Sequence, residues 1–196
     1  MTADVITGLP TPKDEWDERE LAQAILTITS MEHQGKPIFD MAIWTALDHL
    51  PLDRDEALEQ LGIEYDEYDV TQAPDAMILK ADAAPPCGTT MCIAGWATYL
   101  TRWQVHHLDM NVYKNGTWSQ TDKVAHDALG LKDYGLFYTN NEVGTQFLKW
   151  LVIGNKFTLE QITHMDELHN AEVDITNIYN AEQLATAHAA LPPVEG

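Results

Sequence analysis

The chain of 196 residues is poor in basic residues, and it contains no long apolar run. Lysine and arginine together number 11 against 31 aspartates and glutamates, so the formal net charge is −20. A field of that sign repels phosphate groups and anionic lipids, which argues against binding to nucleic acid or to a membrane and favours basic partners. No stretch approaches the roughly 18 apolar residues of a membrane-spanning helix. Residues 1–14 lack the basic start and apolar middle of a signal peptide, so we expect a cytoplasmic protein.

Cysteine is also scarce, and the common catalytic motifs are missing. The two cysteines, Cys87 and Cys92, are too few for the disulfide scaffold of a small secreted domain. The chain has no Walker A loop, no G-x-G-x-x-G, no G-x-S-x-G and no H-E-x-x-H. His164 and His169 come closest to a metal motif, but on a helix they point about 140° apart. These absences favour a protein that is not an enzyme, and we expect neither a cofactor nor a metal.

The apolar pattern predicts a mainly α fold, a compact multi-helix domain with one small β-hairpin. Residues 1–14 hold one glycine and two prolines and are interpreted as a flexible N-terminal arm. Residues 15–196 are interpreted as a single helical domain, in which residues 63–84 form an acidic loop with at most one short strand. The Asn115-Gly116 pair predicts a type I′ turn and therefore a hairpin within residues 107–120.

Apolar spacing and capping residues predict about eight helices. The first begins near Trp16, and Gly35 and Pro37 follow its end. Apolar residues on one side predict the second over residues 39–50. The other expected helices cover residues 53–62, 89–103, 121–129, 142–152, 158–169 and 180–190.

The densest motif, C-G-T-T-M-C-I-A-G, starts at Cys87. Thr89 or Thr90 is expected to cap a helix there, and the second glycine of the motif predicts that another segment packs closely against that helix. A thiol just ahead of a helix N-terminus is stabilised as a thiolate by the helix dipole. Cys87 is therefore the candidate nucleophile of a cysteine-dependent enzyme, with a histidine such as His107 as its base. In the competing structural interpretation Cys92 belongs to the core and Cys87 to a turn.

A zinc site is a further alternative, because Cys87, Cys92, His106 and His107 together offer four zinc ligands. The spacing argues against it. Four residues separate the cysteines, more than in a usual zinc knuckle. Adjacent histidines on a strand also point to opposite faces. The other six histidines are expected at the surface or partly buried.

An acidic block occupies residues 53–69, where eight acids accompany one arginine. A run of like charge is often only a solvated face. The two tyrosines within this run, however, offer aromatic surface that a partner protein could contact. The leading hypothesis is a surface that binds a basic protein; the alternative is a DNA mimic that occupies a nucleic-acid-binding protein. The candidate partner-binding residues are Asp53, Asp55, Glu56, Glu59, Glu64, Tyr65, Asp66, Glu67, Tyr68 and Asp69.

Three motifs along about 100 residues carry a resemblance. They are Phe39-Asp40-Met41 with Trp44, the Cys87–Gly95 segment, and an Ala125–Leu131 stretch that Leu136-Phe137-Tyr138 follow. In these motifs the chain resembles a family of small uncharacterised proteins of actinobacteriophages and some of their actinobacterial hosts. The acidic insert between the first two motifs departs from that pattern. The resemblance implies a phage origin, without an activity, cofactor or catalytic residue to carry over. The resulting hypothesis is a phage-encoded, non-enzymatic accessory protein in the cytoplasm of the infected host.

Overall fold

The computed structural model describes residues 5–47, 49–64, 73–86 and 89–192. Within these ranges it contains seven α-helices, one four-stranded sheet and one two-stranded sheet. Helix makes up 42% and strand 13% of the structure. The fold is therefore mixed α/β, and the prediction of a mainly α domain with one small hairpin is wrong.

Capping residues mark most of the helix starts. The helices are α1 (Glu18–Thr29), α2 (Arg54–Gln60), α3 (Ile93–Leu100), α4 (Thr121–Ala128), α5 (Asn141–Val152), α6 (Leu159–Asn170) and α7 (Ala181–Ala189), with 3₁₀ turns η3 (Asp75–Met77) and η4 (Gly135–Tyr138). Thr158 and Gln161 form the capping box of α6, as predicted. The Asn180 side chain accepts the backbone N–H of Gln183 at the start of α7.

The larger sheet is antiparallel, and its strands follow the chain order β3-β4-β5-β6. The strands are β3 (Ile78–Leu79), β4 (Gln104–His106), β5 (Asn111–Lys114) and β6 (Thr117–Gln120), and the small sheet pairs β1 (Glu32–His33) with β2 (Lys36–Pro37). The predicted type I′ turn joins β5 to β6, with φ of 51° at Asn115 and 82° at Gly116. The hairpin is confirmed, but it is half of a four-stranded sheet. The other two strands, β3 and β4, are too short for an alternation of apolar and polar residues to be visible in the sequence.

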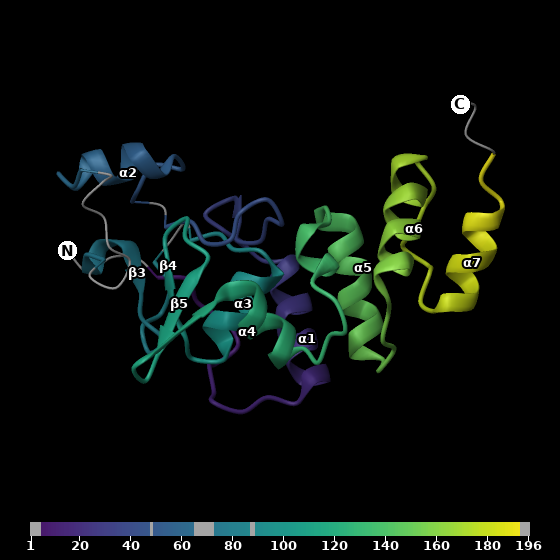
Figure 1. The fold of residues 1–196 in the computed structure, drawn as a ribbon, viewed down its shortest axis with the longest axis horizontal. Helices are drawn as coiled ribbons and strands as arrows, with labels where there is room; N and C mark the ends of the chain where they lie inside the picture. The colour runs from purple at the N-terminus through teal and green to yellow at the C-terminus, as the bar shows by residue number, and fades with distance from the viewer. Residues whose placement is uncertain (1–4, 48, 65–72, 87–88, 193–196) are drawn as a thin grey trace.

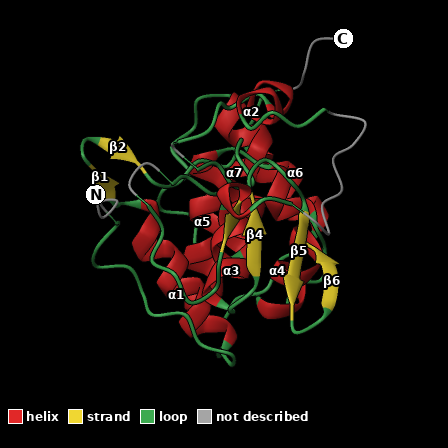
Figure 2. Cartoon of the chain, turned by 90° about the vertical axis from the view of Figure 1, so that its left-hand side faces the viewer, coloured by secondary structure: helices red, strands yellow, loops and turns green. Residues whose placement is uncertain are grey.

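Along the long axis of the molecule, α2 and the four-stranded sheet lie at one end, α3, α4, α1 and α5 in the middle, and α6 and α7 at the other end (Figure 1). The four-stranded sheet lies in front of α3 and α4 when it faces the viewer (Figure 2). Helix α3 packs on α4 and α1, α1 packs on α5, and α6 lies between α5 and α7. All eight residues of α3 are buried, which makes this helix the centre of the core.

Residues 39–47 do not form the predicted helix. Their backbone pairs instead with the chain just ahead of α3: Phe39 bridges Met91, and Ala46 bridges Thr90. The apolar residues that suggested a helix are still used, since Phe39 and Leu47 are buried in the core. Long-range pairing has overridden a helical period, which single-segment reasoning cannot anticipate.

The start of α3 is later than predicted. Thr90 is engaged in pairing, because its N–H donates to Ala46 O and its carbonyl accepts from Ala46 N. The helix begins only after this pairing ends, with Cys92 as N-cap and without a side-chain capping bond. The expectation that Thr89 or Thr90 caps the helix is wrong for this reason.

Gly95 allows the close approach that its position in a helix predicted. A Cβ atom there would overlap the carbonyl oxygen of Trp44 and lie 2.9 Å from Cβ of Met91. The motif therefore serves packing: its glycine lets the 39–47 segment lie directly on α3.

The N-terminal segment from residue 5 onward runs along the body. Ile6 N donates to Pro85 O at 2.9 Å, and Lys13 N donates to Leu100 O at 3.0 Å. The indole of Trp16 also donates to Leu100 O, at 2.8 Å. Ile6 is buried in the main core. None of the described helices is long and apolar enough to cross a membrane.

Candidate functional site

Helix α2 sits on an apolar cluster of its own, apart from the main core. The cluster consists of Leu50, Ala57, Leu58 and Met77. Figure 1 shows α2 standing at one end of the molecule, above the edge of the sheet where β3 lies. The described part of the acidic block, residues 53–64, therefore lies on and beside a short helix at this end of the molecule.

The described acids of this block all face solvent. They are Asp53, Asp55, Glu56, Glu59 and Glu64, and we call them the α2 carboxylate cluster. The side chain of Asp53 also caps the helix by accepting the N–H of Glu56 at 3.0 Å. None of the five forms an ion pair with any residue in the described ranges. The predicted binding residues Tyr65, Asp66, Glu67, Tyr68 and Asp69 lie outside the described residues.

The basic residue inside the block turns toward the body. Arg54 Nη2 lies 3.2 Å from Asp109 Oδ2, and the Asp109 side chain is only 6% exposed. The other carboxylate oxygen of Asp109 accepts the backbone N–H and the side-chain amide of Asn111, each at 2.8 Å. Asp109 thus pairs with Arg54 on the side of α2 that faces the body, while the fully exposed charged residues of the described segment are acids.

His107 ties the start of α2 to the sheet. Its Nδ1 accepts the N–H of Leu47 at 2.9 Å, and its Nε2 lies 2.7 Å from the carbonyl of Pro51, to which it donates. The backbone N–H of His107 donates to the carbonyl oxygen of Met77 at 2.8 Å. Burial lowers the pKa of His107, with the Pro51 carbonyl opposing that shift. His107 therefore carries a neutral imidazole bonded to Leu47 and Pro51, and its backbone bonds Met77, beneath α2.

The bonding of His107 bears on the predicted cysteine enzyme. A general base needs a free lone pair on the ring, and the only one here accepts the N–H of Leu47. The candidate nucleophile Cys87 lies outside the described residues. Cys92 is buried as expected, and burial raises the pKa of its thiol to about 11. His107, the base considered for that hypothesis, is therefore not available, and Cys92 is the core residue that the structural interpretation expected.

The neighbouring His106 is also buried, but neither of its ring nitrogens has a hydrogen-bond partner among the described residues. Its ring packs against Trp118 with centroids 5.5 Å apart. Burial lowers its pKa, and the charge of Asp109 opposes that shift. The two adjacent histidines thus differ: one is a hydrogen-bonded clamp and the other an apolar packing group. With His107 committed to the backbone and Cys92 to the core, the zinc set considered above does not assemble.

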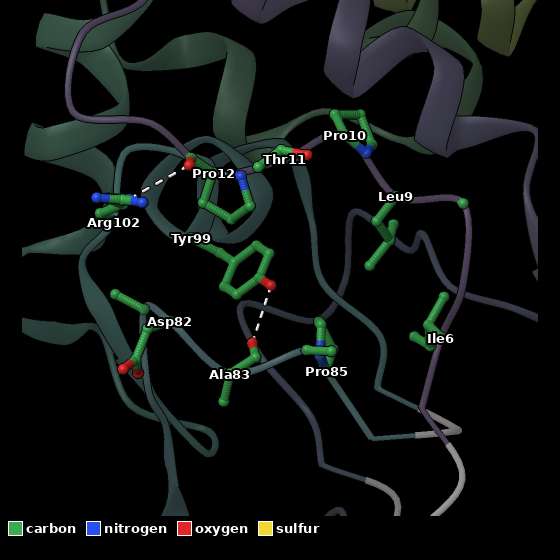
Figure 3. A pocket seen from close by; sticks show the side chains of 13 residues that line it. Ile6, Leu9, Pro10, Thr11, Pro12, Asp82, Ala83, Pro85, Tyr99 and Arg102 are labelled. Atoms are coloured by element: carbon green, nitrogen blue, oxygen red, sulfur yellow. Dashed lines mark hydrogen bonds between the residues drawn. The ribbon is translucent and has the colours of Figure 1, made fainter.

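A hollow of about 330 Å³ lies between the N-terminal segment and the loop of residues 81–85 (Figure 3). Tyr99 forms part of its lining and donates its hydroxyl to Ala83 O at 3.0 Å. Arg102 donates to Pro12 O at 3.2 Å across the same hollow. These two bonds tie residues 81–85 to Tyr99 of α3 and the N-terminal segment to Arg102, so both side chains are used to hold the chain in place.

A second hollow of about 460 Å³ adjoins the first and shares Asp82 and Arg102 with it. Here Asp14 is paired with Arg102 at 3.3 Å and with Lys114 at 3.1 Å. These pairs leave the charges of the hollow balanced. The hollow lacks a pair of groups whose environments set them apart as acid and base.

Six basic residues outside α2 pair with acids within the described ranges. The pairs are Lys13 with Glu20, Lys80 with Asp75, Arg102 and Lys114 with Asp14, Lys123 with Asp127, and Lys156 with Glu18. The five acids of the α2 carboxylate cluster form no such pair with a described residue.

No protein-family model, curated protein or solved structure matches the chain.

Sequence reasoning found the acids of α2 but missed the residues that orient them. Asp109 and His107 come from the segment after β4, more than forty residues along the chain. Leu52, a large apolar residue that is 68% exposed beside the carboxylates, was also missed. The one available signal was Arg54, a lone base within a run of acids, which suggests a buried partner.

Proposed function

We propose that this chain is a phage-encoded, non-enzymatic accessory protein that binds a basic protein of the host or the phage through the α2 carboxylate cluster. The family resemblance supports the phage setting and the host cytoplasm as the place of action. The observation that carries the proposal is the exposure of five carboxylates on and beside α2, none with an ion-pair partner among the described residues.

The construction of this end of the molecule favours recognition over mere solubility. Asp109 holds Arg54 inward, and His107 fixes Pro51 at the approach to the helix. The carboxylates are therefore presented from an anchored frame, which lowers the entropy cost of forming a complex. Leu52 adds exposed apolar area next to the charges, as interfaces with a polar rim commonly do.

The test compares two double charge reversals in capture from an actinobacterial host lysate. Asp55→Lys with Glu56→Lys alters two exposed acids of the first turn of α2. Glu160→Lys with Glu182→Lys is the matched control, because both acids are exposed first-turn residues, of α6 and α7. We expect the wild-type chain and the control to retain one stoichiometric basic partner, and the α2 variant to lose it.

Salt and DNA complete the experiment. Exposed charges are screened beyond about 10 Å at 0.1 M salt, so capture should weaken steeply as salt is raised. Equal capture by both variants would refute the proposed surface. Competition by duplex DNA would identify the partner as a nucleic-acid-binding protein and turn the proposal into the DNA-mimic form.

A further inference from the structure

Three potential metal ligands meet at the other end of the molecule. His164 and Glu167 belong to α6, and His188 belongs to α7. One ligand atom from each lies within 4.8 Å of the other two. The two histidine side chains are half-buried, and that of Glu167 is exposed.

Helix geometry explains why these residues meet. His164 and Glu167 are three residues apart and therefore share one face of α6. On α7, His188 follows the buried Leu184 by four residues, which places it one turn along the face that packs on the body. Helices α6 and α7 contact each other directly. The cluster consequently forms at the seam between two helices.

The side chains are already in mutual contact. The rings of His164 and His188 stack with centroids 3.8 Å apart and an interplanar angle of 13°. His188 Nε2 lies 2.5 Å from Glu167 Oε2, and the ring N–H donates its proton to the carboxylate in this hydrogen bond. A metal ion is a natural substitute for that proton, because the imidazole can move its proton to Nδ1 or release it when an ion takes Nε2.

We propose that His164, Glu167 and His188 form a binding site for a divalent transition-metal ion of the Zn²⁺ type. Two imidazoles and one carboxylate are a donor set of zinc sites, and three protein ligands leave a fourth position for water. Such a set suits borderline metals better than Mg²⁺ or Ca²⁺, which prefer oxygen ligands throughout.

The ion can enter once the side chains rotate. The two imidazole planes are nearly parallel, so the rings must tilt before their in-plane lone pairs can converge on one ion. Ligand atoms about 2.0 Å from a tetrahedral ion lie roughly 3.3 Å from one another. Ligand atoms now separated by up to 4.8 Å must therefore approach one another, and the Glu167–His188 contact must lengthen. The partial exposure of all three side chains leaves room for both movements and a path for the ion. The net charge of −20 also raises the local concentration of cations.

Binding would join α7 to the rest of the chain. Leu184 is the single residue of α7 that is fully buried in the core. A metal bridge between α6 and α7 would add a second fixed point to this last helix. The inference is independent of the proposed function, because the cluster and α2 lie at opposite ends of the molecule (Figure 1).

The experiment titrates the tag-free, chelator-treated full chain with Zn²⁺ by calorimetry and with Co²⁺ by visible absorption. We expect one ion per chain. His164→Gln, Glu167→Gln and His188→Gln should each weaken binding by at least about tenfold, since each removes one of three ligands. Co²⁺ should give the intense d–d bands of a four-coordinate site in the wild-type chain and lose them in His188→Gln.

The matched control is His169→Gln on the same helix. His169 faces a different hollow, with Lys149 and Asp174 in its lining, and should leave both titrations unchanged. Glu167→Gln keeps the side-chain shape, and circular dichroism checks that every variant retains its helices. The proposal is overturned if no saturable binding occurs, if His188→Gln binds as well as the wild type, or if His169→Gln weakens binding equally.

Discussion

The two ends of the molecule each carry a short helix, and they differ in where their polar side chains are fixed. Beneath α2 the polar anchors, His107 and Asp109, are buried, while the fully exposed charged residues of the described α2 segment are all acids. At α7 the polar side chains of the seam are half-buried or exposed, and nitrogen and oxygen ligands lie close to one another. In our proposals the first arrangement presents a fixed charged surface to a protein partner. The second leaves side chains free to converge on a metal ion.

The largest effect is expected when the buried anchor beneath α2, His107, is removed. His107→Leu leaves the N–H of Leu47 and the carbonyl of Pro51 buried without their partner. Each orphaned group costs about 1–3 kcal/mol, so we expect a loss of about 4 kcal/mol in the free energy of unfolding. Urea denaturation followed by fluorescence measures this loss.

The same variant distinguishes partner capture at α2 from metal binding at α7. Local loosening near α2 should weaken partner capture, while Zn²⁺ binding per folded chain should stay unchanged, because no ligand of that cluster contacts His107. A stability equal to that of the wild type would show that the two bonds of His107 carry no net energy.

At the other end of the molecule, Leu184→Ala is expected to destabilise the packing of α7. Truncating a buried leucine costs about 3 kcal/mol, and here the loss falls on the residue that holds α7 to the core. We expect α7 to open locally, which hydrogen exchange of its amides would detect as lost protection. Zn²⁺ affinity should fall with it, whereas capture through α2 should persist. If the α7 amides kept their protection, the helix would have to be held by something other than Leu184.

The contrast also shows which parts of the structure a sequence can predict. Local signals succeeded: the Thr158–Gln161 capping box and the Asn115-Gly116 turn each depend on residues that are neighbours along the chain. The unfavourable helix propensity of Gly95 correctly indicated that another segment approaches α3 closely. It did not indicate that the segment is the backbone at Trp44.

Features made by distant residues were missed. Strand β4 has three residues and β3 two, which is too short for alternation to be visible. Residues 39–47 pair with the chain before α3 and so lose the helix that their apolar spacing suggested. For the same reason His164 was judged only against His169 on its own helix, while its neighbour in space, His188, comes from α7.

Acidification should affect the α2 end selectively. Burial lowers the pKa of His106 and of His107 below the ordinary value of 6.5. In the unfolded chain both imidazoles protonate as the pH falls past about 6.5, while in the folded chain burial shifts their protonation to lower pH. The unfolded state then binds more protons, so stability must decrease between about pH 7 and pH 5.5.

This decrease is measured as the shift of the urea midpoint between those two pH values. The variant with both His106→Leu and His107→Leu should lose most of the shift, because it lacks both groups. An equal shift in that variant and in the wild type would assign the pH dependence to other residues.

The smallest effect is expected at His106, and it sharpens the contrast with its neighbour. His106→Leu replaces a buried ring whose nitrogens are unpaired within the described structure, so it removes a desolvation cost and orphans nothing. It also loses the ring contact with Trp118, and we expect the two changes to cancel to within about 1 kcal/mol. The same substitution at position 107 serves as the control in the same denaturation experiment. A loss at position 106 as large as at position 107 would mean that a bonded water satisfies the ring of His106, and that both histidines are polar anchors of the α2 end.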